Sequence, residues 1–287
     1  MKITSYIFLA LAAILFIGGL MTCSVAETMA KAQNVSIFEQ KKDKKGNSIY
    51  TYKLTDEKLS KLNLNFSNVD VKIVGSAKES YVELKNFDAY DYSTTLSGST
   101  VTVDGTVSGL SSIIDLSGGG LRFKGFRYLF VNKTAKNAKR SVTVYISDSC
   151  DLSSLTINLE KGSVTVNNVY NKIDYNITVN LGNVSFNNVN TESVINLDVN
   201  SGEINVENTE CVTFNANLVS CKTTIDLTKL NHNYITYNVK TENSTVVHNG
   251  SLDDDGQFAV IVSTDLLKSM IKINAIGSEI ILKDSAP

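Results

Sequence analysis

The sequence predicts an all-β fold, a β-solenoid or β-helix of stacked rungs of about 20 residues, with an N-terminal hydrophobic helix. The first observation behind this prediction is a repeat, because three phrases recur 20 residues apart: LTINLEKGSVTVNNV from Leu155, YNITVNLGNVSFNNV from Tyr175 and INLDVNSGEINVENT from Ile195. The second is composition, because one proline and no tryptophan accompany abundant Val, Thr, Ser and Asn. These residues favour strands and short turns.

Each repeat alternates apolar and polar residues on both sides of a turn glycine, at Gly162, Gly182 or Gly202. Apolar residues lie seven, five and three positions before the glycine and two and four positions after it. This is the pattern of a half-buried strand. The same frame fits three later turn residues, Cys221, Glu242 and Ser278. A single rung buries too few apolar side chains to offset its backbone entropy, so we expect all six rungs to stack.

Outside the regular repeats, alternating apolar residues predict strands at 62–66, 69–73, 81–84, 101–103 and 142–146. The insertion between Glu242 and Ser278 holds a predicted strand around 258–262 and a short helix at 265–270. Asparagines recur at the second turn of the repeats, at Asn167–Asn168, Asn187–Asn188 and Asn208. We interpret them as turn formers that also ladder between rungs, and a sugar-binding row is the alternative.

The chain is expected to have three parts: a transmembrane anchor or signal segment at 1–26, a linker at 27–54 and the solenoid domain at 55–287. Ile3 to Ala26 is 24 residues without a charge, and about 20 apolar residues span a bilayer. The segment therefore predicts a single-pass cell-membrane protein with an extracytoplasmic domain. Cleavage after Ala26, which would secrete the domain, and lipidation at Cys23 are the alternatives.

Several phrases together resemble a known family: LNLNFSNVDVKIVGS from Leu62, SVTVYISDSCDLSSLTINLEKGSVTVNNV from Ser141 and INLDVNSGEINV from Ile195. They are similar to the bacterial "putative adhesin" family of β-strand-repeat proteins, a domain class of unknown function, across most of residues 60–283. The resemblance implies a β-solenoid on the outer face of the membrane and supplies no catalytic residues. Non-glycine residues at the three later turns depart from the family's SG and GN turns.

A basic and aromatic segment is the candidate binding site. Seven Lys and Arg residues lie between Asp115 and Asp148 without an acidic residue, and they include all three arginines of the chain. Such residues are enriched at interfaces and are attracted to anionic lipid surfaces. We expect a contact with anionic lipid, wall polymer or a membrane protein, and the alternative is a solvated hairpin. The candidate residues are Arg122, Phe123, Lys124, Phe126, Arg127, Tyr128, Lys133, Lys136, Lys139 and Arg140.

Other chemistry is not expected. The net charge of −2 gives no reason to propose a nucleic-acid partner. Two histidines and four scattered cysteines predict no metal site, and Asp253-Asp254-Asp255-Gly256 lacks the ligand spacing of a calcium loop. The sequence has no GxSxG elbow and no P-loop, and we expect no cofactor.

These observations predict a non-enzymatic scaffold or adhesin-like binding surface that is tethered at the bacterial cell envelope. An accessory or regulatory component of an envelope-stress signalling system is the alternative, which the family resemblance alone suggests. A carbohydrate-active β-helix enzyme is a third interpretation. Its carboxylates would have to share one column, whereas Glu160, Asp198, Glu203 and Asp226 are scattered along the chain.

Overall fold

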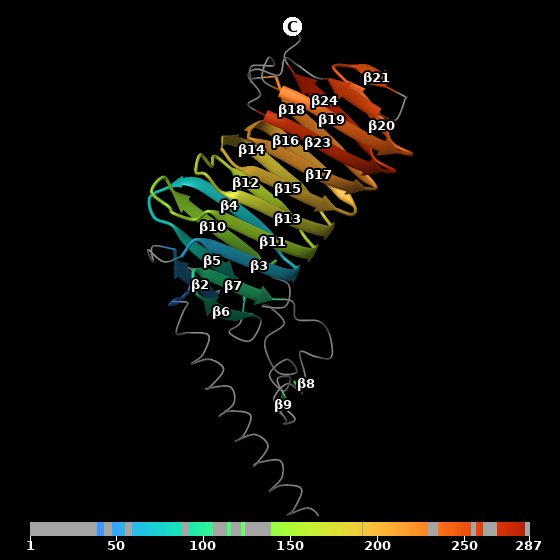
Figure 1. Ribbon diagram of the computed structural model, residues 1–287. Coiled ribbons are helices and arrows are strands. Elements are labelled where there is room, and N and C mark those ends of the chain that lie inside the picture. Colours follow the sequence, from blue (N-terminus) through green and yellow to red (C-terminus); the bar gives the residue numbers. More distant parts are fainter. Residues whose placement is uncertain are drawn as a thin grey trace, which may run out of the picture.

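The computed structural model describes residues 39–42, 48–54, 59–87, 92–105, 114–115, 122–123, 139–190, 192–228, 235–253, 257–260 and 269–284. Every regular element within these ranges is a β-strand, and two large sheets with mostly parallel strands form an elongated stack (Figure 1). The predicted all-β fold is confirmed. The described part holds no helix able to span a membrane, and the hydrophobic segment at 3–26 lies outside the described residues.

The ten-stranded sheet runs, in spatial order, β22 (Gln257–Val260), β19 (Ile235–Glu242), β23 (Ser269–Ile276), β17 (Thr213–Val219), β15 (Val194–Val199), β13 (Asp174–Leu181), β11 (Ser154–Lys161), β3 (Lys61–Asn68), β7 (Thr100–Gly105), β6 (Ser93–Ser97). The twelve-stranded sheet runs β1 (Glu39–Lys42), β2 (Ser48–Lys53), β5 (Tyr81–Lys85), β10 (Ser141–Ser147), β4 (Asp70–Ala77), β12 (Val164–Asn167), β14 (Val184–Asn190), β16 (Gly202–Glu210), β18 (Cys221–Leu227), β24 (Glu279–Asp284), β20 (Thr245–His248), β21 (Ser251–Asp253). A separate two-stranded ribbon pairs β8 (Ile114–Asp115) with β9 (Arg122–Phe123).

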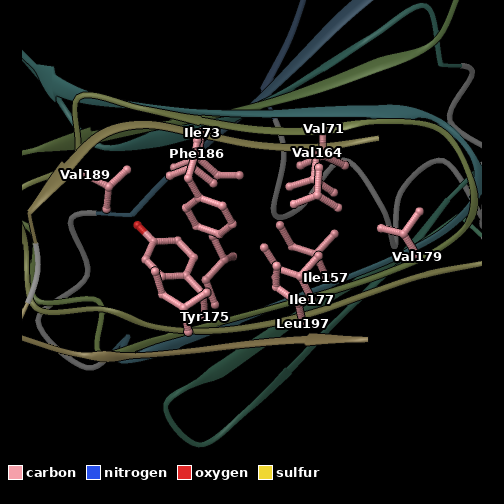
Figure 2. Close-up of a cluster of buried hydrophobic side chains, with 14 of the residues drawn as sticks. Val71, Ile73, Ile157, Val164, Tyr175, Ile177, Val179, Phe186, Val189 and Leu197 are labelled. Atoms are coloured by element: carbon pink, nitrogen blue, oxygen red, sulfur yellow. The ribbon is translucent and has the colours of Figure 1, made fainter. Parts of the chain in front are cut away.

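Each repeat forms one rung, with its first strand in the ten-stranded sheet and its second strand in the twelve-stranded sheet. Rungs stack in register at the predicted period, so Ile157 pairs with Ile177 and Ile177 with Leu197. These side chains form a column that faces Val71 and Val164 across the core (Figure 2). Because alternate residues point to opposite faces of a strand, the apolar set is buried and the polar set faces outward.

The first turn explains why glycine recurs in three rungs. A Cβ on Gly182 would lie 1.6 Å from the carbonyl oxygen of Gly162, and the φ of Gly182 is +153°. Successive rungs therefore approach too closely here for any side chain. In the three later rungs the positive φ moves one residue earlier, to Ser220 (53°), Asn243 (50°) and Gly277 (59°). That shift lets the chain hold Cys221 and Ser278 at the turn position.

The last two rungs differ from the prediction in order and in frame. Strand β23 lies between β17 and β19, so the C-terminal rung is next to the rung of β17, and the rung of β19, which precedes it in sequence, is further along the stack. Tyr237 pairs with Ile271 and Val246 with Ile280, which makes Ser244, and not Glu242, the turn residue. The predicted frame was wrong by two residues here. Alternation alone does not reveal such an error, because a shift of two residues keeps every side chain on its own face of the sheet.

The ends of the stack also differ from expectation. Strands β1 and β2 lie in the stretch expected to be a linker, β2 pairs with β5, and Tyr50 on β2 is buried. The sheet therefore begins before residue 55. The short helix predicted at 265–270 is wrong for its last two residues, because β23 already begins at Ser269. Antiparallel strands close both ends of the stack. At one end lie β6 of the ten-stranded sheet and β5, β2 and β1 of the twelve-stranded sheet; at the other end lie β22 and β21. Such strands replace the neighbouring rung that an end lacks.

Candidate binding surface

The outward side of the ten-stranded sheet has an unusual composition. Two columns of side chains run along the stack, six and four positions before each turn, and most members are asparagine or threonine. We call these two columns the amide face. The first column is Asn63, Thr156, Asn176, Asn196, Asn215, Lys272 and Asn238 in spatial order. The second column is Asn65, Asn158, Thr178, Asp198, Asn217, Asn274 and Lys240.

Amides on neighbouring rungs of this face bond to one another. Nδ2 of Asn215 donates to Oδ1 of Asn196 at 2.8 Å, and Nδ2 of Asn196 donates to Oδ1 of Asn176 at 2.9 Å. In the second column, Asn158 donates to Asn65 at 2.8 Å and Asn274 to Asn217 at 3.0 Å. In-register parallel stacking brings like side chains to about 4.8 Å, the spacing at which amide ladders form. Each ladder fixes the direction of its side chains.

The asparagines at the second turn form a further ladder. Asn168, Asn188 and Asn208 have φ values of 53°, 52° and 47°, in the left-handed region that asparagine tolerates. Asn188 donates to Asn168 at 3.3 Å, and Asn208 donates to Asn188 at 3.0 Å. The predicted role as turn formers that ladder between rungs is confirmed.

Side chains just after the first turn also link neighbouring rungs. Oδ1 of Asp70 accepts hydrogen bonds from the backbone N–H (3.1 Å) and the hydroxyl (2.7 Å) of Ser163. Oδ1 of Asn183 accepts the N–H of Glu203 at 3.0 Å. These bonds satisfy backbone donors at the start of the second strand.

The structure places four of the ten residues in the candidate basic segment. Arg122 and Phe123 form β9 and pair with β8. Lys139 forms an ion pair with Asp70, and the guanidinium carbon of Arg140 lies 5.4 Å from the ring centre of Phe87. Burial raises the pKa of Asp70, but bonds from Lys139 and Ser163 outweigh it, so the net pKa lies below its usual value. The other candidates, Lys124, Phe126, Arg127, Tyr128, Lys133 and Lys136, lie outside the described residues.

A polar cluster inside the C-terminal end of the stack was not predicted. Nε2 of His248 lies 3.1 Å from Oδ2 of Asp284, and Nδ2 of Asn249 donates to Oδ1 of Asp284 at 2.6 Å. Asp284 is buried, and the ring of Tyr237 lies 5.8 Å from that of His248. Burial raises the pKa of Asp284, but bonds from Asn249, His248 and Tyr237 outweigh it and lower the net pKa.

A sequence signal for this cluster exists in the corrected frame. There, His248 pairs with Leu282 and Asp284 pairs with Leu227, so both polar residues occupy inward positions that other rungs fill with apolar side chains. In the frame centred on Glu242, His248 lies six positions after the turn, past the last apolar position of the repeat. Within the described ranges, no group of His, Cys, Asp and Glu side chains could hold a metal ion. Asp254, Asp255 and Gly256 lie outside those ranges, which leaves the expectation for the acidic turn untested.

The two-sheet stack defines a β-repeat scaffold with long polar outer faces. A family model, Toastrack DUF4097, matches residues 59–274, and the chain belongs to this family. This membership confirms the adhesin-like β-repeat resemblance, and the family's function is not established.

Comparison with solved structures gives distant likenesses. A "putative cell adhesion protein" from Clostridium sporogenes is 12% identical over 86% of this chain and 100% of that chain, with a TM-score of 0.45. A "putative adhesin" from Bacteroides fragilis is 12% identical over 82% of this chain and 96% of that chain, with a TM-score of 0.39. A "putative lipid binding protein" from Parabacteroides distasonis is 13% identical over 82% of this chain and 96% of that chain, with a TM-score of 0.28. No curated protein matches the chain.

Proposed function

We propose that this protein is a non-enzymatic binding scaffold at the bacterial cell envelope and that the amide face is its working surface. One observation supports this most: the fold holds two columns of amide and hydroxyl groups in register across seven rungs. A fixed row of repeated donors and acceptors suits the binding of an extended partner, since little order must be created on binding.

The experiment compares two variants of the full chain, kept in detergent micelles, for binding to detergent-washed cell-envelope fragments. Thr178→Arg places a long charged side chain in the middle of the amide face, at an exposed position. Asn205→Arg makes the same type of change at an exposed position on the opposite sheet and is the matched control. We expect Thr178→Arg to sediment with the fragments much less than Asn205→Arg, which should bind as the unaltered chain does. Equal binding by both variants would contradict the proposal.

The proposed location is the cell membrane, with residues 3–26 as a single-pass anchor and the solenoid on the extracytoplasmic side. Its support is the uncharged length of this segment, which suffices to span a bilayer. Protease added to intact cells should digest the solenoid while the membrane fraction retains the N-terminus. Recovery of the solenoid in the medium would instead support cleavage near Ala26.

The basic segment is proposed as a second contact, with anionic lipid, wall polymer or a membrane protein. Lys139 and Arg140 already contact Asp70 and Phe87, so the proposal rests chiefly on residues from Arg122 to Lys136. Binding of the full chain to vesicles rich in phosphatidylglycerol should weaken with salt. It should also be lost when Arg122, Lys124 and Arg127 are all changed to Ala. Binding that survives this triple change would exclude a lipid contact through the segment.

A further inference from the structure

We propose that the amide face binds a neutral, extended glycan strand, laid along the stack with successive sugars on successive rungs. The inference rests on the proposed function and names the class of partner. Its basis is the match between the groups on this face and sugar hydroxyls, which both donate and accept hydrogen bonds. A primary amide also offers both, with two N–H donors and an acceptor oxygen.

The ladder leaves part of each amide available. Asn196 donates one N–H to Asn176 and accepts one hydrogen bond from Asn215. The remaining N–H and the remaining lone pair of Asn196 are then left for solvent or a ligand. The pairs Asn158–Asn65 and Asn274–Asn217 of the second column keep unused amide groups in the same way. A ligand with regularly repeated hydroxyls therefore meets similar groups on several rungs.

The spacing of the face suits such a polymer. Rungs repeat every 4.8 Å or so along the stack, close to the advance per sugar in an extended β-1,4-linked chain. The two columns are two residues apart along each strand, about 6.6 Å, so they can contact both edges of a sugar ring. Seven rungs cover about 29 Å. Amide ladders also favour a flat sheet, which a straight polymer requires.

The charges on the face favour a neutral partner. From Asn63 to Asn217, Asp198 is the one charged residue among the ten residues of the two columns. A polyanion would find no basic residue along this part of the two columns. Protein interfaces usually have an apolar centre. The two columns contain no apolar side chain, and the exposed apolar residues of this sheet, Leu96, Leu181, Val219 and Ile276, lie outside them.

The mode of binding has a measurable consequence. The two columns hold no aromatic ring, so each sugar contributes a weak contact through hydrogen bonds. Affinity then accumulates as further sugars reach further rungs. We expect the dissociation constant to fall at least about tenfold from a disaccharide to a hexasaccharide. A pocket that binds only the end of a glycan would show no dependence of affinity on glycan length.

The test is calorimetric titration of the full chain in detergent micelles with chitobiose and chitohexaose, two neutral β-1,4-linked probes. We expect measurable binding of the hexamer and weaker binding of the dimer. Thr178→Arg should lose hexamer binding and Asn205→Arg should retain it. Asn217→Arg, two rungs away in the same column, should also lose it and replaces Thr178→Arg if that variant misfolds.

Three outcomes would overturn the glycan proposal: no hexamer binding, equal affinity for dimer and hexamer, or binding unaffected by both face variants. Full displacement of the hexamer by lipoteichoic acid would overturn the requirement for a neutral partner. If chitohexaose does not bind, but binding to envelope fragments is still lost in Thr178→Arg, then the amide face is the working surface and the glycan proposal is wrong. A protein captured through the face would then be the partner class.

Discussion

Replacing Gly182 with alanine tests the close approach of neighbouring rungs. The new Cβ would lie 1.6 Å from the Gly162 oxygen and 2.7 Å from the Gly162 carbonyl carbon, both backbone atoms that cannot move aside alone. The rungs must separate, which weakens two hydrogen bonds: Gly162 N–H to Leu181 O (3.0 Å) and Val164 N–H to Asn183 O (2.8 Å). Those bonds contribute about 1–3 kcal/mol together. The positive φ adds about 1–3 kcal/mol, so we expect a loss of roughly 2–6 kcal/mol in the free energy of unfolding.

Gly98 provides the control for this experiment. Its φ is +58°, but a Cβ there would have no atom within 4 Å. Gly98→Ala should therefore cost only backbone strain, about 1–2 kcal/mol. Urea unfolding of both variants, followed by far-UV circular dichroism, measures the difference. If Gly182→Ala costs no more than Gly98→Ala, the close packing of rungs at the first turn is wrong.

Three further predictions concern the core, the ladder and the C-terminal cluster. Val184→Asp should lower the free energy of unfolding by more than about 3 kcal/mol, because Val184 is 1% exposed and the carboxylate would be unpaired. Asn183→Asp keeps the acceptor for the Glu203 N–H and should cost under about 1 kcal/mol. Equal losses of the two variants in urea unfolding would contradict the register. Asn196→Ala should cost about 1–3 kcal/mol through two lost side-chain bonds, and thermal unfolding that is no more affected than in Asn205→Ala would exclude a stabilising ladder. The pKa of Asp284 is lowered, so its stabilising effect is present above the unfolded-state pKa, about 3.9, and is lost as the pH falls through the folded-state pKa. Asp284→Asn should therefore lose less stability than the unaltered chain as the pH falls below about 4, and an unchanged acid transition would count against the cluster.

The fold was predictable because alternation and turn chemistry act within one rung. The interval between Gly162, Gly182 and Gly202 sets the period, and burial of Ile157, Ile177 and Leu197 follows from it. The ladder of second-turn asparagines follows from the same period.

Features that depend on contacts between distant segments were not predictable. Alternation cannot distinguish Glu242 from Ser244 as a turn residue, since a two-residue shift preserves burial. Nor does it show that β23 inserts between β17 and β19, because each rung pairs equally well with either neighbour on local grounds. The ion pair between Lys139 and Asp70 likewise depends on β10 lying beside β4. The amide face was visible only as scattered polar residues until the strands were paired.

In-register stacking of rungs is the central claim, and engineered disulfides test it most directly. Thr178 and Asp198 pair in register on neighbouring strands, and their Cα atoms lie about 4.8 Å apart. Cysteines at these two positions should form a disulfide rapidly under mild oxidation. Cysteines at Thr178 and Asn200 are offset by two residues, about 8 Å apart, which exceeds the roughly 7 Å limit for a disulfide, and should remain reduced. Faster bonding of the second pair, or equal bonding of both, would contradict the stack.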